Sequence, residues 1–174
     1  MIIIHAVQKL LNTGKVKPVL YISEPSAGQH MHSWYAKLLS TGFAGKFLVM
    51  YVHQPSLLTV LTRSKTINST ISQFYNRLPA LLARHNFKPA FIESEMKFIH
   101  EGYVISKTNS KSMLGHLNEL TLNIEILCRR FPSYEAIDLE DIENAYTGWI
   151  SFDKTLKKYK TVMEYWMEKE ALVV

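Results

Sequence analysis

Runs of apolar and β-branched residues in the first part of the chain predict a β-sheet. Ile2 to Ala6 is nearly continuous in apolarity, as a central strand often is. Three further runs share this character, at Trp34 to Ser40, Lys46 to His53 and Leu57 to Thr62. The segments between them carry turn residues, glycines in 41–45 and a proline in 54–56. The three runs therefore predict an antiparallel meander. Shorter strands are predicted at Val19 to Ser23 and Tyr103 to Ser106.

Elsewhere the apolar residues follow the spacing of amphipathic helices. One such pattern begins at Ile67 and predicts a helix over 69–86, with Asn68 or Ser69 as its N-cap. Pro79 lies inside the pattern and predicts a kink or a break. The clearest helix is predicted over 112–130, where the apolar stripe is Met113, Leu117, Leu120, Ile124 and Leu127. Two short helices are predicted at Val7 to Asn12 and Phe91 to Ile99.

The last part of the chain is helical in character. Asp138 is the predicted N-cap of a helix from Leu139 to Tyr146, and Gly148 is its predicted end. Asp153 is predicted to cap a final helix that reaches about Ala171. Because strands and helices do not alternate regularly, we expect an α+β fold. Its core domain, residues 1–131, should pack an antiparallel sheet of about five strands against the helices at 69–86 and 112–130. Residues 132–174 should form a helical extension packed on that core.

Composition and charge restrict the class of protein. The chain has 174 residues, of which 47% are hydrophobic and 20% charged, so it can bury a substantial core. The single cysteine, Cys128, cannot form an internal disulfide, which fits a reducing compartment. The apolar start is too brief for a signal peptide, and no stretch approaches the ~20 apolar residues that a membrane span needs. We therefore expect a cytoplasmic protein without a membrane partner.

A net charge of +5 and a pI near 9.2 favour polyanionic partners modestly. The tightest basic group is Lys154, Lys157, Lys158 and Lys160. Such a group is typical of the solvated face of a helix, and it is also a candidate polyanion-binding patch. Both interpretations stay open at the level of the sequence.

The segment from residue 107 to residue 120 is the most informative part of the sequence. A polar loop leads directly into the helix at 112–130, whose N-terminal amides and dipole favour an anion. Gly115 costs about 1 kcal/mol relative to alanine inside a helix, which indicates a close approach of a strand or a ligand. The candidate ligand-binding residues are Lys107, Thr108, Asn109, Ser110, Lys111, His116 and Asn118. The alternative is that they cap and solvate the helix. No phosphate-loop pattern is present.

Other residue patterns give weaker indications of chemistry. His30 and His32 share one face of an extended segment and could hold a metal, but nothing fixes a third ligand, so we predict no metal and no cofactor. The helix C-terminus beside Cys128 disfavours a reactive thiolate. Trp34 and Tyr35 could stack on bases or pack in the core, with one ring buried and the other exposed.

Three stretches together resemble a known family. They are Met1 to Leu11, Trp34 to Leu38, and Lys107 to Glu119 with its Thr-Asn-x-x-Ser-x-Leu-Gly-x-Leu-Asn-Glu run from Thr108. The sequence is similar there to a bacterial domain of unknown function, found in small stand-alone proteins and in proteins related to plasmid-encoded open reading frames. The resemblance covers about residues 1–130. It implies a shared fold and no particular activity.

Two hypotheses about function follow. The first is a non-catalytic binding module for a protein or nucleic-acid partner, because the sequence contains no catalytic constellation and is basic. The alternative is a small enzyme or small-ligand binder that uses the loop at 107–112 and the N-terminus of the helix at 112–130. It predicts that the candidate side chains of this segment line a pocket.

Overall fold

A computed structural model of the chain describes residues 1–20, 22, 28, 30–148, 150–153 and 158–173. Within these residues the elements follow in the order β1 (Ile2–Ala6), α1 (Gln8–Gly14), β2 (Ser33–Ser40), β3 (Phe47–His53), β4 (Thr59–Arg63), α2 (Ile67–Arg84), α3 (Pro89–His100), β5 (Tyr103–Lys107), α4 (Lys111–Cys128), α5 (Leu139–Thr147), β6 (Ile150–Asp153), β7 (Lys158–Thr161) and α6 (Val162–Glu168). The α+β class predicted from the sequence is confirmed.

The main sheet is mixed, which corrects the expectation of an antiparallel sheet. Its strand order is β4-β3-β2-β1-β5. The predicted meander of β2, β3 and β4 is confirmed as antiparallel, but β1 pairs in parallel with both β2 and β5. Apolar periodicity places strands and faces, but it does not encode the direction in which two distant strands pair. As a result, the carboxyl ends of β1, β2, β4 and β5 meet at one edge of the sheet.

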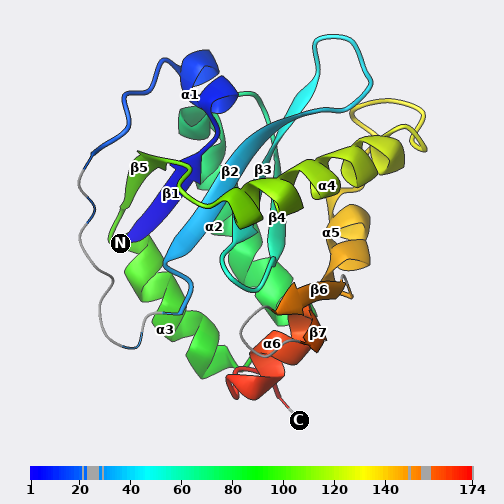
Figure 1. Cartoon of the computed structure of the whole chain (residues 1–174). Helices are drawn as coiled ribbons and strands as arrows, with labels where there is room; N and C mark the ends of the chain where they lie inside the picture. Colours follow the sequence, from blue (N-terminus) through cyan, green and yellow to red (C-terminus); the bar gives the residue numbers. More distant parts are fainter. Residues whose placement is uncertain (21, 23–27, 29, 149, 154–157, 174) are drawn as a thin grey trace.

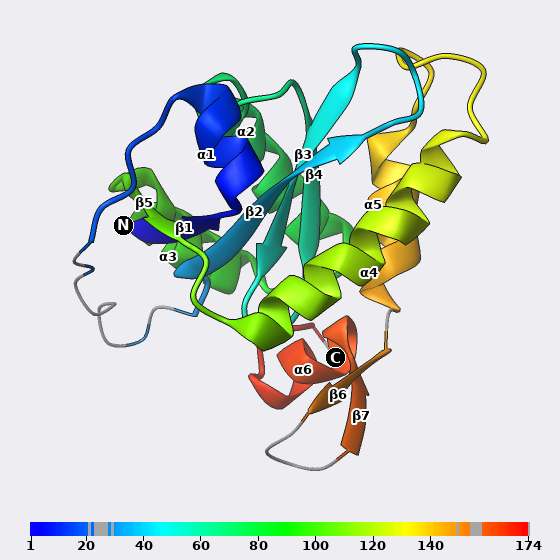
Figure 2. The ribbon, with the colours of Figure 1, turned by 45° about the horizontal axis from the view of Figure 1, so that its top comes forward.

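Helices cover both faces of this sheet (Figures 1 and 2). On one face Trp34 and Tyr51 pack against Phe74 of α2, with ring centroids 4.9 and 4.7 Å apart. On the other face Tyr35 forms a hydrogen bond with Asn109, just before α4. Lys37 forms one with Asn118, within α4. Neighbouring strand residues thus point to opposite layers. Helix α3 lies beside α2, and α5 lies against the outer strand β4.

Helix α2 differs from the sequence prediction at its start and in its middle. Its N-cap is Thr66, whose hydroxyl accepts from the Ser69 amide at 3.2 Å, rather than Asn68 or Ser69. Pro79 does not break the helix, which continues to Arg84. Burial of Leu78, Leu81 and Leu82 on both sides of the proline holds the helix together, because packing outweighs the lost backbone hydrogen bond.

The predicted strand at 19–23 is not formed by its described residues. Val19 instead donates one backbone hydrogen bond, 2.8 Å long, to the Ile105 carbonyl at the outer edge of β5. Residues 21 and 23 lie outside the described part of the chain.

The single C-terminal helix predicted after Asp153 is also wrong. The strands β6 and β7 form an antiparallel hairpin, and α6 begins only after Thr161, whose side chain forms a capping box with Glu164. This reciprocal cap fixes the start of the helix eight residues later than the sequence analysis placed it. Trp166 of α6 is fully buried against Phe87, Phe91 and His53. Among the described residues, no helix combines the length and the apolarity needed to cross a membrane.

Candidate functional site

The loop from β5 to α4 is tied to the sheet by a buried tyrosine. The Tyr35 hydroxyl donates to Oδ1 of Asn109, and the Tyr35 ring stacks on His5 with centroids 4.7 Å apart. Burial lowers the pKa of His5, so its ring is neutral at pH 7. Ser110 caps α4 by accepting from the Met113 amide at 3.2 Å, in line with the alternative that residues of this segment cap the helix. Asn109 and Ser110 therefore join the loop to the core and start the helix.

Farther along α4, Asn118 makes a second polar contact with β2. Its Oδ1 accepts from Nζ of Lys37 at 2.7 Å. Burial lowers the pKa of Lys37, and the charge of Glu125 opposes that effect. The close approach expected at Gly115 is absent, because a Cβ placed there meets nothing within 4 Å. His116 is half-buried on the same helix.

The remaining residues of the candidate segment face outward. Lys107 and Lys111 are exposed, and Thr108 is half-buried between them. Two hollows lined by described residues lie elsewhere, near β7 and at the start of β3. The segment thus exposes Lys107 and Lys111, whereas the side chains of Asn109 and Ser110 form hydrogen bonds within the protein.

Trp34 and Tyr35 are both fully buried, so neither ring is available for stacking on bases. The expectation that one of them lies at an exposed edge is therefore wrong. The two rings point to opposite faces of β2, and a helix covers each face.

The histidines form no metal site among the described residues. His53 is completely buried, and its Nε2 donates to the His30 carbonyl at 3.0 Å while Nδ1 accepts from the Ser56 hydroxyl at 2.7 Å. Burial lowers the pKa of His53 to about 3. Burial likewise raises the pKa of the Cys128 thiol to about 11. Both groups are therefore neutral at pH 7 and serve packing.

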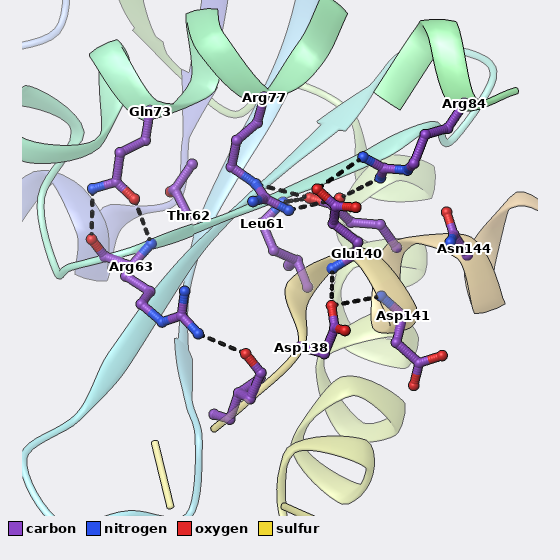
Figure 3. A network of polar contacts seen from close by, with 12 residues as sticks. Leu61, Thr62, Arg63, Gln73, Arg77, Arg84, Asp138, Glu140, Asp141 and Asn144 are labelled. Carbon is purple, nitrogen blue, oxygen red and sulfur yellow. Dashed lines mark hydrogen bonds and ion pairs between the residues drawn. The ribbon is translucent and has the colours of Figure 1, made fainter. Parts of the chain in front are cut away.

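A buried ion cluster, absent from the sequence-based candidates, joins α5 to β4 and α2. Glu143 has a fully buried side chain and accepts from Arg77 and Arg84 at 2.8 and 3.0 Å and from the Leu61 amide at 2.8 Å. Figure 3 shows the two arginines reaching from α2 to this point beside Leu61. Burial raises the pKa of Glu143, and the Leu61 amide and the arginines oppose that effect.

This cluster satisfies a backbone group of the outer strand β4. Strand β4 is the outer strand, and its unpaired backbone groups would otherwise be open to another chain. Glu143 accepts a hydrogen bond from the Leu61 amide. The Gln73 side chain accepts from the Arg63 amide and donates to the Arg63 carbonyl (Figure 3). The ion cluster therefore has a structural role, in which a carboxylate and an amide complete the ladder of the outer strand.

The C-terminal lysine group is only partly described. Lys154 and Lys157 lie outside the described residues, and so does the side chain of Lys158. Lys160 is 7% exposed, and its Nζ bonds to Glu168. Lys160 therefore takes part in the packing of α6 on β7.

A basic surface instead follows from the topology of the main sheet. Lys9 comes after the carboxyl end of β1, Lys65 after that of β4, and Lys107 at that of β5, while Lys46 precedes the amino end of β3. All four are exposed. Because these strand ends lie at one edge of the sheet, the four lysines are distributed along that edge. We call this the basic edge, comprising Lys9, Lys15, Lys46, Lys65 and Lys107.

Contacts between loops bring neighbouring parts of the basic edge together. A Cβ at Gly14 would lie 3.6 Å from Thr66, so the end of α1 with Lys15 adjoins the turn that carries Lys65. Lys46 and Arg63 both approach the ring of Tyr134, at 5.2 and 5.7 Å from its centroid. Glu135 forms an exposed ion pair with Lys46 at 3.1 Å.

The edge also contains a small hollow of about 220 Å³. It lies between the start of β3 and the turn before α2, and it is lined by Gly45, Lys46, Phe47, Ser64, Lys65 and Tyr134. The lining thus combines two lysines, of which Lys46 is paired with Glu135, with a serine and two aromatic residues. Such a combination binds phosphate or carboxylate groups by charge and adjacent flat groups by stacking.

One sequence signal for this surface was missed. Glu24 is the single acidic residue before Glu93, although lysines and arginines occur throughout that stretch. A charge asymmetry between the two halves of a chain indicates a polyanionic partner. The asymmetry predicts a basic surface, but its location required the strand order.

Comparison with known proteins identifies the family of this chain. No curated protein matches the sequence. Residues 3–164 match a family described as a domain of unknown function, DUF6933, so the match extends beyond the segment of about 1–130 that carried the resemblance and includes α5, β6 and β7. With nearly the whole chain matched, this protein belongs to the DUF6933 family.

Proposed function

We propose that this protein is a non-catalytic binding module for a polyanionic partner, with nucleic acid as the partner class. The observation that carries the proposal is the convergence of lysines from β1, β3, β4 and β5 on the basic edge. Each lysine that contacts a phosphate releases a condensed counterion, which favours binding without base-specific contacts. The hollow with Lys46, Lys65 and Tyr134 offers a place for a phosphate beside a base.

The state of the buried reactive groups supports a role without catalysis. A general base or nucleophile works best with a pKa near the operating pH. Burial moves the pKa of His53 down to about 3 and that of Cys128 up to about 11, which is away from that range in both cases. The Glu143 carboxylate already accepts hydrogen bonds from two arginines and a backbone amide.

The loop at 107–111 contributes to the proposed surface through Lys107, at the carboxyl end of β5. The alternative, a small-ligand site or enzyme at residues 107–112, stays a prediction that the same binding experiments test. A bacterial origin, which the resemblance implies, and a cytoplasmic location belong to this proposal too, since nucleic acid is accessible there.

The test measures binding of a labelled oligonucleotide by fluorescence anisotropy over a series of salt concentrations. Wild type should bind, and the logarithm of its affinity should fall linearly with the logarithm of salt concentration. Changing Lys9, Lys65 and Lys107 together to glutamine should weaken binding at low salt at least tenfold and reduce the slope by roughly 2 to 3. Single variants supply the matched comparison, because Lys65→Gln removes one charge from the basic edge and Lys97→Gln removes one from an exposed site on α3, away from that edge.

Two results would reject the proposal. One is an affinity that does not change between low and high salt, because a polyanion contact must depend on ions. The other is equal binding by Lys65→Gln and by Lys97→Gln, since the basic edge would then contribute nothing beyond net charge.

A further inference from the structure

The outward face of α4 carries an apolar pair that the fold does not use. The buried residues of this helix are Met113, Leu117, Leu120, Ile124 and Cys128. On the opposite side, Leu122 and Ile126 are 65% and 57% exposed and lie one helical turn apart. Figure 2 shows α4 lying across β2, β3 and β4 as the outer layer on its side of the sheet. Another chain can therefore approach this face.

The exposed stripe has the spacing of a helix-pairing seam. Gly115, Glu119, Leu122, Ile126 and Arg129 follow one another at intervals of four, three, four and three. The four-three spacing is that of a heptad, with Leu122 and Ile126 as its two apolar positions and the charged Glu119 and Arg129 on either side of them. Gly115, above which a Cβ finds nothing within 4 Å, leaves room for a close approach at the start of the stripe.

The stripe is also complementary to the same stripe on a second copy that runs in the opposite direction. When two copies of a helix pair antiparallel, residues equally far from the central residue face each other. About Ile124, Leu122 then faces Ile126 of the second copy, and Glu119 faces Arg129 with Arg130 beside it. Apolar positions meet apolar positions, and an acidic position meets basic ones. A parallel pair would instead place Glu119 against itself, which is repulsive.

The charged ends of the stripe are available for this contact. Among the residues that the structure describes, no ion pair involves Glu119, Arg129 or Arg130, and all three are exposed. The Arg129 side chain lies over the turn at Gly42, so Arg130 is the more accessible of the two arginines.

We infer that this protein pairs with a second copy of itself through an antiparallel contact between the two α4 helices. The geometry joins Leu122 to Ile126 and Glu119 to Arg130 across a two-fold axis near Ile124, as expected of an isologous interface. A single helix pair buries less than a standard interface of about 1,600 Å², so the dimer is weak and forms at high protein concentration.

The experiment measures the dimer dissociation constant by sedimentation over a wide range of protein concentrations. Ile126→Glu should weaken the dimer tenfold or more, roughly, because it buries a charge in the seam. Circular dichroism should show an unchanged fold, since Ile126 is exposed. The matched control is Ser112→Glu at the start of the same helix, which adds the same charge at an exposed position outside the proposed contact.

A charge exchange tests the antiparallel register itself. Glu119→Arg alone and Arg130→Glu alone should each weaken the dimer, because like charges then face each other. An equimolar mixture of these two variants should restore it, since both contacts become complementary again. A monomer at every concentration would overturn the inference, as would a dimer that Ile126→Glu leaves intact or a mixture that fails to pair. Capture of an unrelated protein by a monomeric chain would equally overturn it.

Discussion

Removing the buried carboxylate of Glu143 is the sharpest test of how this fold is held together. The side chain is fully buried and accepts from the Leu61 amide and from two arginines. Glu143→Ala leaves the Leu61 amide without a partner, which costs about 1–3 kcal/mol in a buried site. It also leaves Arg77 and Arg84 without their counterion.

The arginines add to this loss but do not dominate it. Their side chains are 23% and 25% exposed, so water recovers part of their solvation once the carboxylate is gone. Breaking a buried ion pair from one side typically costs about 3–5 kcal/mol, and we expect a total near the lower end of that range. Glu143→Gln, which keeps an oxygen for Leu61, should cost less, about 1.5–3 kcal/mol.

The assay is urea unfolding followed by the fluorescence of the buried tryptophans Trp34 and Trp166. Glu140→Gln on the same helix is the control, because Glu140 also pairs with Arg84, at 3.3 Å, but its side chain is 53% exposed. The control should change the free energy of unfolding by no more than about 0.5 kcal/mol.

Hydrogen exchange at the Leu61 amide adds a local measurement. Exchange should accelerate in Glu143→Ala and stay unchanged in Glu140→Gln, since the first variant alone frees this amide. If Glu143→Ala and Glu140→Gln had equal stabilities, the ion cluster would not be what joins α5 to β4 and α2, and the reasoning would be refuted.

Three further predictions follow from single contacts. Gly115→Ala should stabilise the protein by about 0.5–1 kcal/mol in thermal unfolding, because the added methyl meets open space; a loss of stability would show that something approaches closely there. Tyr35→Phe should cost about 1 kcal/mol in urea unfolding by removing the bond to Asn109, and an unchanged stability would argue against that anchor. The folded-state pKa of His53 is lowered to about 3 from 6.5, so the unfolded chain binds a proton between these values that the folded chain does not. Stability should therefore be complete above pH 6.5 and fall with pH in that window by about 1.4 kcal/mol per unit, and His53→Gln should abolish this part of the pH dependence in acid unfolding curves.

The main features of the individual helices could be predicted from the sequence. The stripe at Met113, Leu117 and Leu120 identifies α4, and the polar residues Ser110 and Asp138 start α4 and α5. These signals act over a few residues, because a helix buries one face and its first amides need a nearby acceptor. The same local logic failed after Asp153, where the capping box at Thr161 competes with a plausible earlier cap.

The candidate site was predictable only in part. The segment at 107–111 is the connection between β5 and α4, and one of its lysines, Lys107, lies on the proposed surface. Asn109 and Asn118 were chosen as ligand-binding candidates, but each bonds to a side chain of β2. The sequence could not indicate this use, because Tyr35 and Lys37 are more than seventy positions away along the chain.

What the sequence determined by itself is most of the elements before residue 150, the N-cap of α5, the α+β class and the excess of basic residues. Only the tertiary structure decided that β1 lies in parallel between β2 and β5, that Lys9, Lys65 and Lys107 share one edge, and that Glu143 completes the outer strand. The periodicity of apolar residues and the capping of helices depend on residues close in the sequence, which stay close in any fold. Strand order and charge convergence arise from contacts between distant segments, and these are selected by how all the buried faces fit together at once.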